Sequence, residues 1–406
     1  MDALMLPLNW QKVRLGDIAE IIGGGTPSTQ ITSFWNGSIN WFTPTEIGIT
    51  KYVYKSQRTI TPLGLKKSSA KLLPIGTILL TSRASIGDCA ILKVVATTNQ
   101  GFQSLIPLEK INNEFLYYLM LTLKNKLLKL ASGSTFLEVS PNKIKNLLIP
   151  LPPLNEQIAI ANILSDVDHY LYSLDALILK KESVKKALSF ELLSQRKRLK
   201  GFNQAWQRVR LGDIGITISG LVGKTKQDFI NGNAKYITFL NVLNNFIIDT
   251  SILENVKIYP NEKQNSFKKY DLFFNTSSET PKEVGMCAVL LDDIDQVFLN
   301  SFCFGFRIFD KAVDGLFLSY LINSEIGRKA FENLAQGSTR YNLSKSGFNN
   351  VCLFLPPLNE QIAIANILSD LDSEIISLKN KKRQFENIKK TLNHDLMSAK
   401  IRVLKK

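Results

Sequence analysis

The chain has 406 residues, 45% of them hydrophobic and 21% charged, which excludes wholesale disorder and predicts two or three globular domains. Its 50 Lys and Arg against 35 Asp and Glu give a net charge of +15, which favours a polyanionic partner, nucleic acid before an acidic protein. The four cysteines include no C-x-x-C pair, which excludes a disulfide framework of the kind found in small secreted domains.

The N-terminal segment lacks the charged region and apolar core of a secretion signal. The most apolar stretch, residues 75–96, contains Arg83, Asp88 and Lys93, so no run reaches membrane-spanning length. We therefore expect a soluble, cytoplasmic protein that does not contact a membrane.

Residues 1–150 carry short apolar runs separated by Gly, Pro, Asn, Ser and Thr. Runs such as residues 76–80 and 89–95 have the length and boundaries of strands, and a helix is expected at residues 113–131. The pattern predicts an α+β domain with a mixed β-sheet.

Residues 151–200 are predicted to form one long helix. Pro152 and Pro153 fit its first turn, and Asn155 can cap the exposed amides. Cations followed by Gly201 predict its end. Its apolar positions are spaced by four and three residues, as in a coiled-coil seam, and comprise Ile160, Leu164, Val167, Leu171 and Leu174.

Residues 201–354 repeat the domain pattern, with strands expected at 236–240, 271–274 and 302–309 and a helix at 315–335. Residues 355–406 repeat the long helix. Because similar seams suit each other, we expect the two helices to pack as an antiparallel coiled coil; the alternative is two amphipathic helices, each buried in its own domain. The second seam comprises Ile364, Leu368, Leu371, Ile375 and Leu378.

The two halves of the chain are related by an internal repeat. LPPLNEQIAIANILSD occupies residues 151–166 and recurs at 355–370, 204 positions later. WQKVRLGDI at residues 10–18 is followed by WQRVRLGDI at 206–214, and Thr81-Ser82 matches Thr276-Ser277. A period this long indicates tandem duplication of a domain with its helix, not a solenoid, and predicts pseudo-twofold symmetry.

Motifs for catalysis are missing from the sequence. The only histidines, His169 and His394, fall in the helical segments, which argues against a His-based triad or metal site. Gly223-Lys224-Thr225 resembles the end of a phosphate-binding loop, but the required first glycine is replaced by Ile218. We therefore expect no catalytic residue, no metal ligand and no cofactor in this chain.

The order and duplication of these motifs resemble the specificity subunits of type I restriction-modification enzymes over essentially the entire chain. WQxVRLGDI, Gly24-Gly25-Thr26-Pro27-Ser28 and the duplicated LPPLNEQIAIANILSD carry the resemblance. It implies target recognition domains at 1–150 and 201–354, and a central and a C-terminal conserved helical region at 151–200 and 355–406. It also implies a non-catalytic subunit that reads an asymmetric, bipartite target in double-stranded DNA.

The resemblance further implies two kinds of partner. Two modification subunits would methylate adenine with S-adenosylmethionine, and motor-nuclease restriction subunits would cleave DNA with ATP and Mg. Three alternatives stay open: a stand-alone methyltransferase or nuclease, a coiled-coil scaffold without DNA binding, and the specificity subunit of a type IIB-like system.

Base contacts must come from polar groups on loops that enter a groove. The sequence does not identify the bases, but the two domains differ, so the half-sites should differ. The candidates are Thr26, Ser28, Thr45, Ser82, Arg83, Asn99 and Gln100 in the first domain, and Lys224, Lys226, Asn241, Ser278 and Asn300 in the second.

Two expectations concern the helices once DNA is the ligand. Residues 180–200 and 379–406 together hold 14 of the 15 excess positive charges, so we expect the basic helix ends to contact phosphates. Because a helix has a fixed rise of ~1.5 Å per residue, we also expect the helices to set the spacing of the half-sites, so that four residues inserted near Asp175 would lengthen the spacer.

Overall fold

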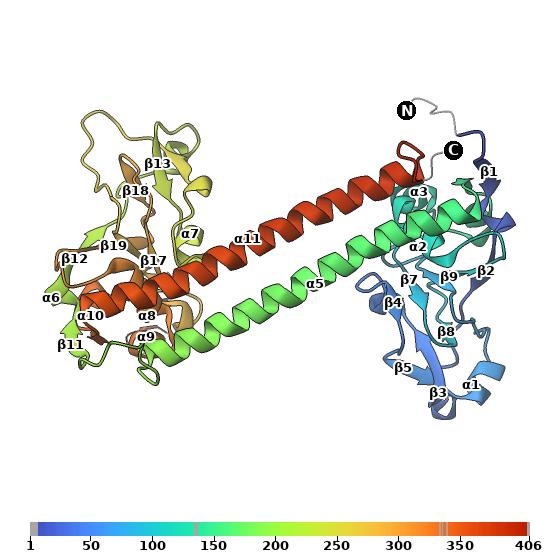
Figure 1. Cartoon of the computed structure of the whole chain (residues 1–406), viewed down its shortest axis with the longest axis horizontal. Helices are drawn as coiled ribbons and strands as arrows, with labels where there is room; N and C mark the ends of the chain where they lie inside the picture. The colour runs from blue at the N-terminus through green and yellow to red at the C-terminus, as the bar shows by residue number, and fades with distance from the viewer. Residues whose placement is uncertain (1–6, 134–136, 333, 335, 338–339, 404–406) are drawn as a thin grey trace. The chain divides into compact units, whose positions relative to one another are not determined.

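The computed structural model describes residues 7–133, 137–332, 334, 336–337 and 340–403. The chain divides into two compact units, one comprising residues 1–175 with 380–406 and the other residues 176–379. Each unit contains a sheet-bearing domain, part of one 40-residue helix and part of the other (Figure 1). Two parts of the sequence predictions lie outside the described residues. They are residue 335, the expected end of the helix at 315–335, and residues 404–406, the last residues of the expected helical region at 355–406.

The domain of unit 1 is built on three sheets. A five-stranded sheet has the order β2-β9-β6-β7-β4, a three-stranded sheet the order β5-β3-β8, and β1 pairs with β10. The pairs β3–β8 and β4–β7 are parallel and the others antiparallel, so the predicted mixed sheet is confirmed. The strands are β1 (Gln11–Arg14), β2 (Ala19–Gly23), β3 (Trp35–Phe42), β4 (Tyr52–Val53), β5 (Arg58–Ile60), β6 (Ile78–Leu80), β7 (Cys89–Leu92), β8 (Ala96–Thr98), β9 (Gln103–Pro107) and β10 (Leu148–Leu151).

The domain of unit 2 repeats this plan with differences at its edges. A four-stranded sheet has the order β12-β19-β15-β17, a three-stranded sheet the order β14-β13-β18, and two further pairs are β11–β21 and β16–β20. Here β13 and β18 are the parallel pair. The strands are β11 (Gln207–Arg210), β12 (Gly215–Ser219), β13 (Ala234–Ile237), β14 (Glu254–Val256), β15 (Leu272–Asn275), β16 (Ser277–Ser278), β17 (Cys287–Val289), β18 (Val297–Leu299), β19 (Cys303–Ile308), β20 (Tyr341–Asn342) and β21 (Cys352–Leu355).

The helix predicted after the strands of each domain begins where expected but is broken into two. Asn112 caps the first by accepting a hydrogen bond from the Phe115 amide at 2.9 Å, and Asp314 caps the second by accepting one from Phe317 at 2.7 Å. The breaks fall at Leu123 and at Ser324, whose backbone is extended. The domain helices are α1 (Pro62–Lys66), α2 (Asn113–Thr122), α3 (Lys124–Leu130), α4 (Pro141–Lys145), α6 (Leu211–Ile214), α7 (Phe239–Asn244), α8 (Gly315–Asn323), α9 (Glu325–Glu332) and α10 (Lys345–Asn349), with 3₁₀ turns η1 (Leu15–Asp17), η2 (Thr32–Phe34), η3 (Pro44–Glu46), η4 (Lys226–Phe229), η5 (Thr250–Ile252) and η6 (Pro281–Glu283).

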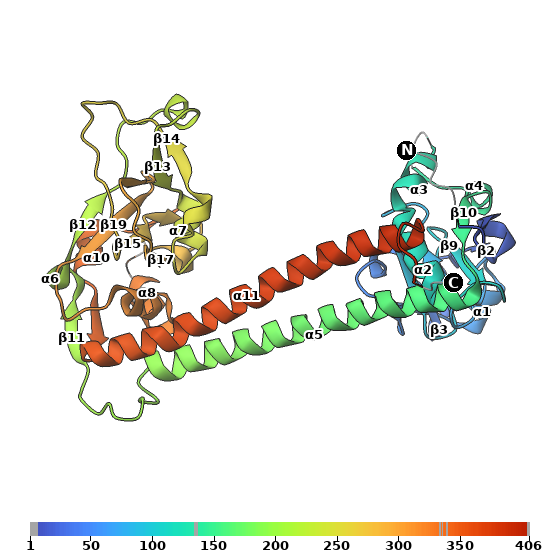
Figure 2. The same ribbon diagram turned by 45° about the horizontal axis from the view of Figure 1, so that its top comes forward.

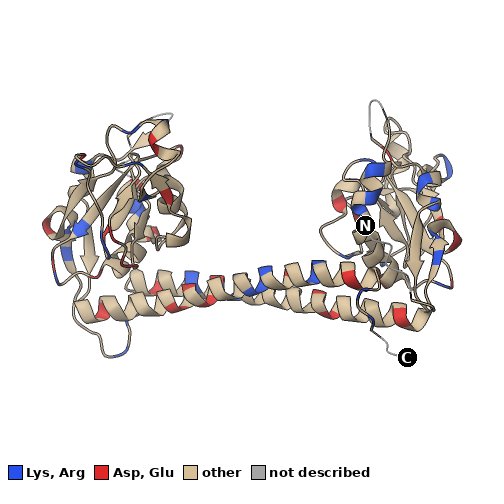
Figure 3. Cartoon of the chain, turned by 90° about the horizontal axis from the view of Figure 1, so that it is seen from above, with Lys and Arg blue, Asp and Glu red and all other residues tan. Residues whose placement is uncertain are grey.

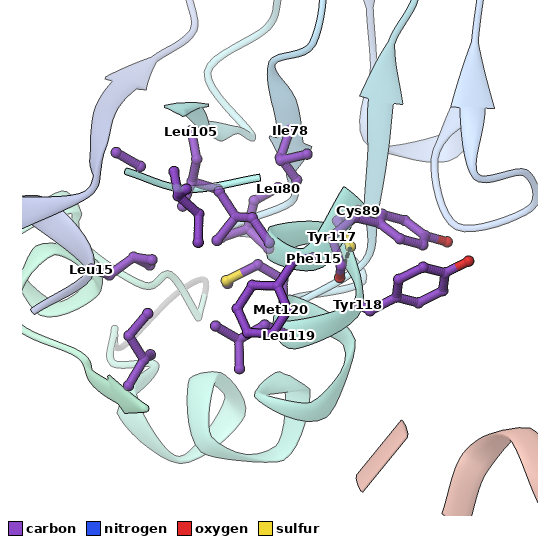
Figure 4. Close-up of a cluster of buried hydrophobic side chains, with 14 of the residues drawn as sticks. Leu15, Ile78, Leu80, Cys89, Leu105, Phe115, Tyr117, Tyr118, Leu119 and Met120 are labelled. Atoms are coloured by element: carbon purple, nitrogen blue, oxygen red, sulfur yellow. Dashed lines mark hydrogen bonds between the residues drawn. The ribbon is translucent and has the colours of Figure 1, made fainter. Parts of the chain in front are cut away.

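Each domain core lies between the larger sheet of the domain and one helix, α2 in unit 1 and α8 in unit 2. In unit 1, Ile78 and Leu80 of β6 face Phe115 and Met120 of α2 (Figure 4). In unit 2, α8 covers the sheet in the same way (Figure 2), and its core is rich in phenylalanine, with ring centroids of Phe274 and Phe348 4.7 Å apart. Burial of such side chains is the main favourable term in forming each domain.

The two long helices are α5 (Leu154–Leu193) and α11 (Leu358–Met397), of 40 residues each. The predicted end of the first long helix is wrong, because α5 stops at Leu193 and does not continue to Gly201. Two residues beyond each end the backbone turns into the left-handed region, at Gln195 with φ 61° and at Ala399 with φ 59°. A non-glycine residue therefore terminates both helices at the same place in the repeat.

The predicted seam residues fall into two groups. Ile160 and Leu164 belong to the domain core of unit 1, where Leu396 and Met397 from the end of α11 join them. Ile364 and Leu368 belong likewise to the core of unit 2, with Leu192 and Leu193 from the end of α5. The remaining positions lie outside the domain cores, Leu174 and Ile375 buried and Val167, Leu171, Leu371 and Leu378 half-buried.

Ion pairs join α5 to α11 within each unit. In unit 1 Asp168 pairs with Lys389, and Asp175 pairs with Lys382 at 2.6 Å. In unit 2 the pairs are Lys181–Glu374 at 2.8 Å, Lys185–Asp372 at 2.5 Å and Glu182–Lys379 at 2.7 Å. Rising numbers on α5 meet falling numbers on α11, so the two segments run in opposite directions within each unit. All the Lys and Arg residues of each long helix lie in its second half, whereas its first half carries only acidic charges (Figure 3). The opposed segments therefore bring unlike charges together within each unit, and part of the positive charge expected to face phosphates is neutralised by neighbouring carboxylates.

Candidate nucleic-acid interface

In unit 1, the loops that follow β2, β3, β6 and β8 gather at the carboxyl ends of these strands. We call residues 24–28, 43–46, 81–85 and 99–101 the first loop cluster. Three backbone hydrogen bonds hold it together: Gly25 N to Thr98 O at 2.9 Å, Asn99 N to Phe42 O at 3.0 Å and Ser82 N to Gly101 O at 2.8 Å. Such loops on a rigid sheet are where binding groups are usually placed.

Unit 2 carries a second loop cluster, residues 220–226, 238–241, 276–279 and 300–302. The strand ends and the backbone hydrogen bonds that join these loops, which we call the frame, are equivalent to those of unit 1. The three matching bonds of unit 2 are Leu221 N to Leu299 O at 2.8 Å, Asn300 N to Ile237 O at 3.0 Å and Thr276 N to Phe302 O at 3.0 Å. These bonds make Thr276 the counterpart of Ser82, so the match of Thr81-Ser82 to Thr276-Ser277 drawn from the sequence is wrong by one residue.

A glycine at the same place in both frames allows the loops to approach closely. A Cβ on Gly24 would lie 1.9 Å from the Asn99 carbonyl oxygen, and one on Gly220 would lie 2.3 Å from that of Asn300. Both distances are shorter than any real contact, so each position requires glycine. The loop backbone is thus fixed in the same way in both domains, while the side chains around it differ.

Five of the candidates in the first domain lie in the first loop cluster with at least one polar group near the surface. The Thr26 hydroxyl donates to Gln100 Oε1, and the exposed Thr45 hydroxyl lies 3.0 Å from that of Thr43. Ser28 is exposed, and Asn99 uses its side-chain oxygen to accept from the Gly101 amide at 2.8 Å. The structure therefore brings together residues that lie up to 74 positions apart in the chain.

Ser82 and Arg83 are placed differently. Ser82 is fully buried, and its hydroxyl donates to the Gly101 carbonyl at 3.1 Å. Arg83 forms an ion pair with Glu138, with Nε and Oε2 3.2 Å apart. In this structure Ser82 therefore holds the loops together, and the charge of Arg83 is partly neutralised.

Three candidates in the second domain have their polar groups occupied within the protein. Lys224 is 5% exposed at its side chain and donates to Glu262 Oε2 at 2.5 Å; this hydrogen bond is the main reason that the pKa of Glu262 falls to about 2. Asn241 is fully buried and bonds the backbone of Asp249 through both its amide oxygen and its nitrogen. The Ser278 hydroxyl donates to Glu283 at 2.7 Å.

The other two candidates face solvent in whole or in part. Lys226 is exposed on η4, and the half-buried Asn300 accepts from the Phe302 amide at 2.8 Å. Asn300 and Asn99 therefore make the same turn in the two clusters. Sequence reasoning missed the exposed arginine Arg58, whose guanidinium lies over the Trp35 ring; only the pairing of distant strands reveals that contact.

The repeated sequence at the start of each long helix makes the same arginine and glutamine contacts twice. Glu156 accepts from Arg402 Nε at 2.7 Å and from the Trp10 indole at 3.1 Å. Glu360 accepts from Arg198 Nε at 2.7 Å. The following glutamine also repeats its contacts, since Gln157 accepts from the Asn112 amide and Gln361 from the Asp314 amide, each at 2.9 Å. These contacts explain why part of the repeat is identical.

Other identical residues of the repeat point outward and make no such contact. We call Ile158, Asn162 and Asp166 of α5, with Ile362, Asn366 and Asp370 of α11, the exposed stripes. Ile158 is 41% exposed and Ile362 is 39% exposed, and the four polar residues are exposed as well. Positions four residues apart share one helix face, so each long helix presents the same short surface near its start.

Two kinds of feature do not occur in the described part of the chain. No helix there is both long enough and apolar enough to cross a bilayer. Nor do three or more His, Cys, Asp or Glu side chains gather in it as metal ligands would.

Comparison with known proteins identifies the family. The sequence matches the model of the type I restriction modification DNA specificity domain twice, over residues 7–181 and 203–387. The chain belongs to this family. The two matches fall on the two halves of the internal repeat, and each contains one loop cluster and the larger part of one long helix.

Relatives of the chain in this family extend over most of its length. The MjaIX specificity subunit of a type I restriction enzyme from Methanocaldococcus jannaschii is 31% identical over 303 residues, which cover 70% of this chain and 69% of that protein. The MjaVIII specificity subunit from the same organism is 27% identical over 423 residues, 99% and 95% of the two chains. The S subunit of a type I restriction-modification system from M. genitalium has a similar fold, with a TM-score of 0.58, 18% identity and 97% of both chains covered.

Proposed function

We propose that this chain is the non-catalytic recognition subunit of a type I restriction-modification complex in the cytoplasm. Each loop cluster would read one half of a bipartite, asymmetric target in double-stranded DNA. The observation that carries the proposal is the frame common to both clusters, Gly24 with Asn99 and Gly220 with Asn300, which holds unlike side chains. A common frame with different polar groups suits the reading of two different half-sites, because base identity is read by side-chain donors and acceptors.

The exposed stripes support docking of two modification subunits. Ile158, Asn162 and Asp166 recur as Ile362, Asn366 and Asp370, although no core or cap contact requires their identity. Two equal surfaces bind two copies of one partner, as in symmetric assemblies generally. Methylation of adenine with S-adenosylmethionine would then be performed by those subunits, and cleavage with ATP and Mg by restriction subunits.

The long helices are proposed to set the distance between the half-sites. The domain assignment behind this proposal is recognition at residues 1–150 and 201–354, and helical regions at 151–200 and 355–406. The opposite direction of the paired segments within each unit supports an antiparallel pair of α5 and α11. A continuous helix of 40 residues is ~60 Å long at ~1.5 Å per residue, which is sufficient for a spacer of about one DNA turn.

Methylome mapping tests the proposal. A host without adenine methylation would express the modification subunits with and without this chain. We expect methylation at one bipartite motif only when the chain is present, and no methylation or cleavage by the purified chain supplied with S-adenosylmethionine, or with ATP and Mg. Methylation of the same motif without the chain, or turnover by the chain alone, would contradict it.

A further inference from the structure

Arg58, Trp35 and Trp41 form a stacked group in unit 1. The Arg58 guanidinium carbon lies 3.8 Å from the centroid of the Trp35 ring and 5.4 Å from that of Trp41. The two indole rings meet edge to face, with centroids 5.0 Å apart and an interplanar angle of 87°. A guanidinium over an indole face is held by attraction to the ring and loses rotational freedom before any ligand arrives.

The same two tryptophans support the first loop cluster. Trp35 donates its indole N–H to the Ser28 carbonyl at 3.0 Å, and Trp41 donates to the Gly25 carbonyl at 2.9 Å. Arg58 lies on β5, directly opposite Trp41 of β3. The stacked group is therefore joined to the loop at residues 24–28, and Arg58 lies beside the cluster.

The Arg58 side chain is exposed, and no described carboxylate pairs with it. The arginine within the cluster, Arg83, pairs with Glu138, and Arg402 pairs with Glu156. The Arg58 guanidinium is thus oriented by stacking, while no residue that the structure describes accepts a hydrogen bond from its N–H donors. A planar fork of donors is complementary to the O6 and N7 acceptors of guanine in the major groove.

The counterpart of Arg58 in unit 2 has the opposite hydrogen-bonding character. Tyr236 of β13 corresponds to Trp41, and the residue opposite it on β14 is Glu254. Glu254 is exposed and accepts a hydrogen bond from the Tyr236 hydroxyl at 2.8 Å. One strand position therefore presents donors beside the first cluster and acceptors beside the second, which suits two half-sites that differ at one base pair.

We infer that Arg58 is a base-reading residue for the first half-site, donating two hydrogen bonds to one guanine. The inference rests on the proposed function and adds a named residue and a named base to it. Loss of a bidentate arginine–guanine contact lowers discrimination against the wrong base by about 5- to 150-fold.

The test compares the wild-type chain with Arg58→Lys, Arg58→Ala and Arg14→Ala, each assembled with its modification subunits. Arg14 is an exposed arginine of the same domain on β1, which pairs with β10 and not with the sheet that carries Arg58. Methylome mapping gives the preference at every target position, and thermal unfolding checks that each variant is folded.

We expect both Arg58 variants to lose preference for guanine at one position of one half-site, by the factor given above, with the other half-site unchanged. Arg14→Ala should keep the wild-type motif. An unchanged motif in folded Arg58 variants would overturn the inference, as would a uniform fall in methylation at all sites, which indicates a phosphate contact. Absence of a bipartite motif with the wild-type chain would instead refute the proposed function.

Discussion

Arg198 donates two hydrogen bonds to the buried carboxylate of Glu360, from Nε to Oε1 at 2.7 Å and from Nη2 to Oε2 at 2.6 Å. Arg198 follows the end of α5, whereas Glu360 lies in the first turn of α11. The equivalent pair in unit 1, Arg402 with Glu156, repeats the arrangement at 2.7 Å and 3.1 Å. In each unit the start of one long helix is therefore tied to the segment beyond the end of the other.

Replacement of Arg198 by alanine should strongly destabilise unit 2. The Glu360 side chain is 1% exposed, so its charge would remain buried without a partner, which costs about 3–5 kcal/mol of unfolding free energy. Arg210→Ala is the control, because its pair with Asp213 is exposed at 51% and 57%, so solvent screens it and its loss should change stability little. Urea unfolding followed by circular dichroism would measure both; equal midpoints for the two variants would contradict the prediction.

A charge placed on an exposed stripe should remove one modification subunit from the complex. Ile158→Glu or Ile362→Glu alone is expected to leave one copy bound and the double variant none, because each stripe would dock one copy. Native mass spectrometry of the reconstituted complex would count the copies. Ile49→Glu, at a residue 85% exposed in the first domain, should retain two copies. Two copies bound to the double variant would exclude this surface.

Lengthening both long helices together should lengthen the spacer of the DNA target. Seven residues inserted after Asp175 and again after Lys379 keep every ion pair within each unit and preserve the heptad phase. They add ~10.5 Å of helix at ~1.5 Å per residue, about three base pairs at ~3.4 Å each.

Methylome mapping of that variant should give unchanged half-sites around a longer spacer. Seven Gly and Ser residues inserted after Gly201, a loop residue with φ 95°, should leave the spacer as it is. Altered bases within a half-site together with the original spacer would refute the role of the helices as a ruler.

The cysteines should differ sharply in reactivity with a thiol reagent at pH 8. Burial raises the pKa of Cys89 to about 12, with a further rise from Asp88, and burial also raises the pKa values of Cys287 and Cys303. These three stay protonated and enclosed at pH 8, while Cys352 is partly accessible. With Ellman's reagent, the native protein should release one equivalent of thionitrobenzoate per chain, from one reacting thiol. The urea-unfolded protein should release four equivalents. Cys352→Ser should abolish the native reaction, and fast labelling of that variant would disprove the expected burial.

The sequence by itself determined the features that depend on local patterns. The internal repeat predicted two like domains and two long helices, and the caps at Asn112 and Asp314 begin the domain helices where the sequence placed them. Those signals act over a few residues, because a cap bonds an amide three positions away and a helix face recurs every three or four positions. The end of α5 was predicted less well than its start. Gln195 terminates the helix in a left-handed conformation that glycine usually takes, whereas the sequence pattern pointed to Gly201.

Only the tertiary structure decided which of the polar candidate residues lie at the surface. Ser82, Lys224 and Asn241 are residue types that are common in surface loops. In the folded protein, strands and loops distant in sequence bury these side chains and form hydrogen bonds with their polar groups. The pairing of β3 with β5 brought Arg58 over Trp35, and ion pairs between α5 and α11 neutralised lysines that looked free. Exposure and charge depend on neighbours that folding brings from far along the chain, and no local pattern specifies which neighbours those are.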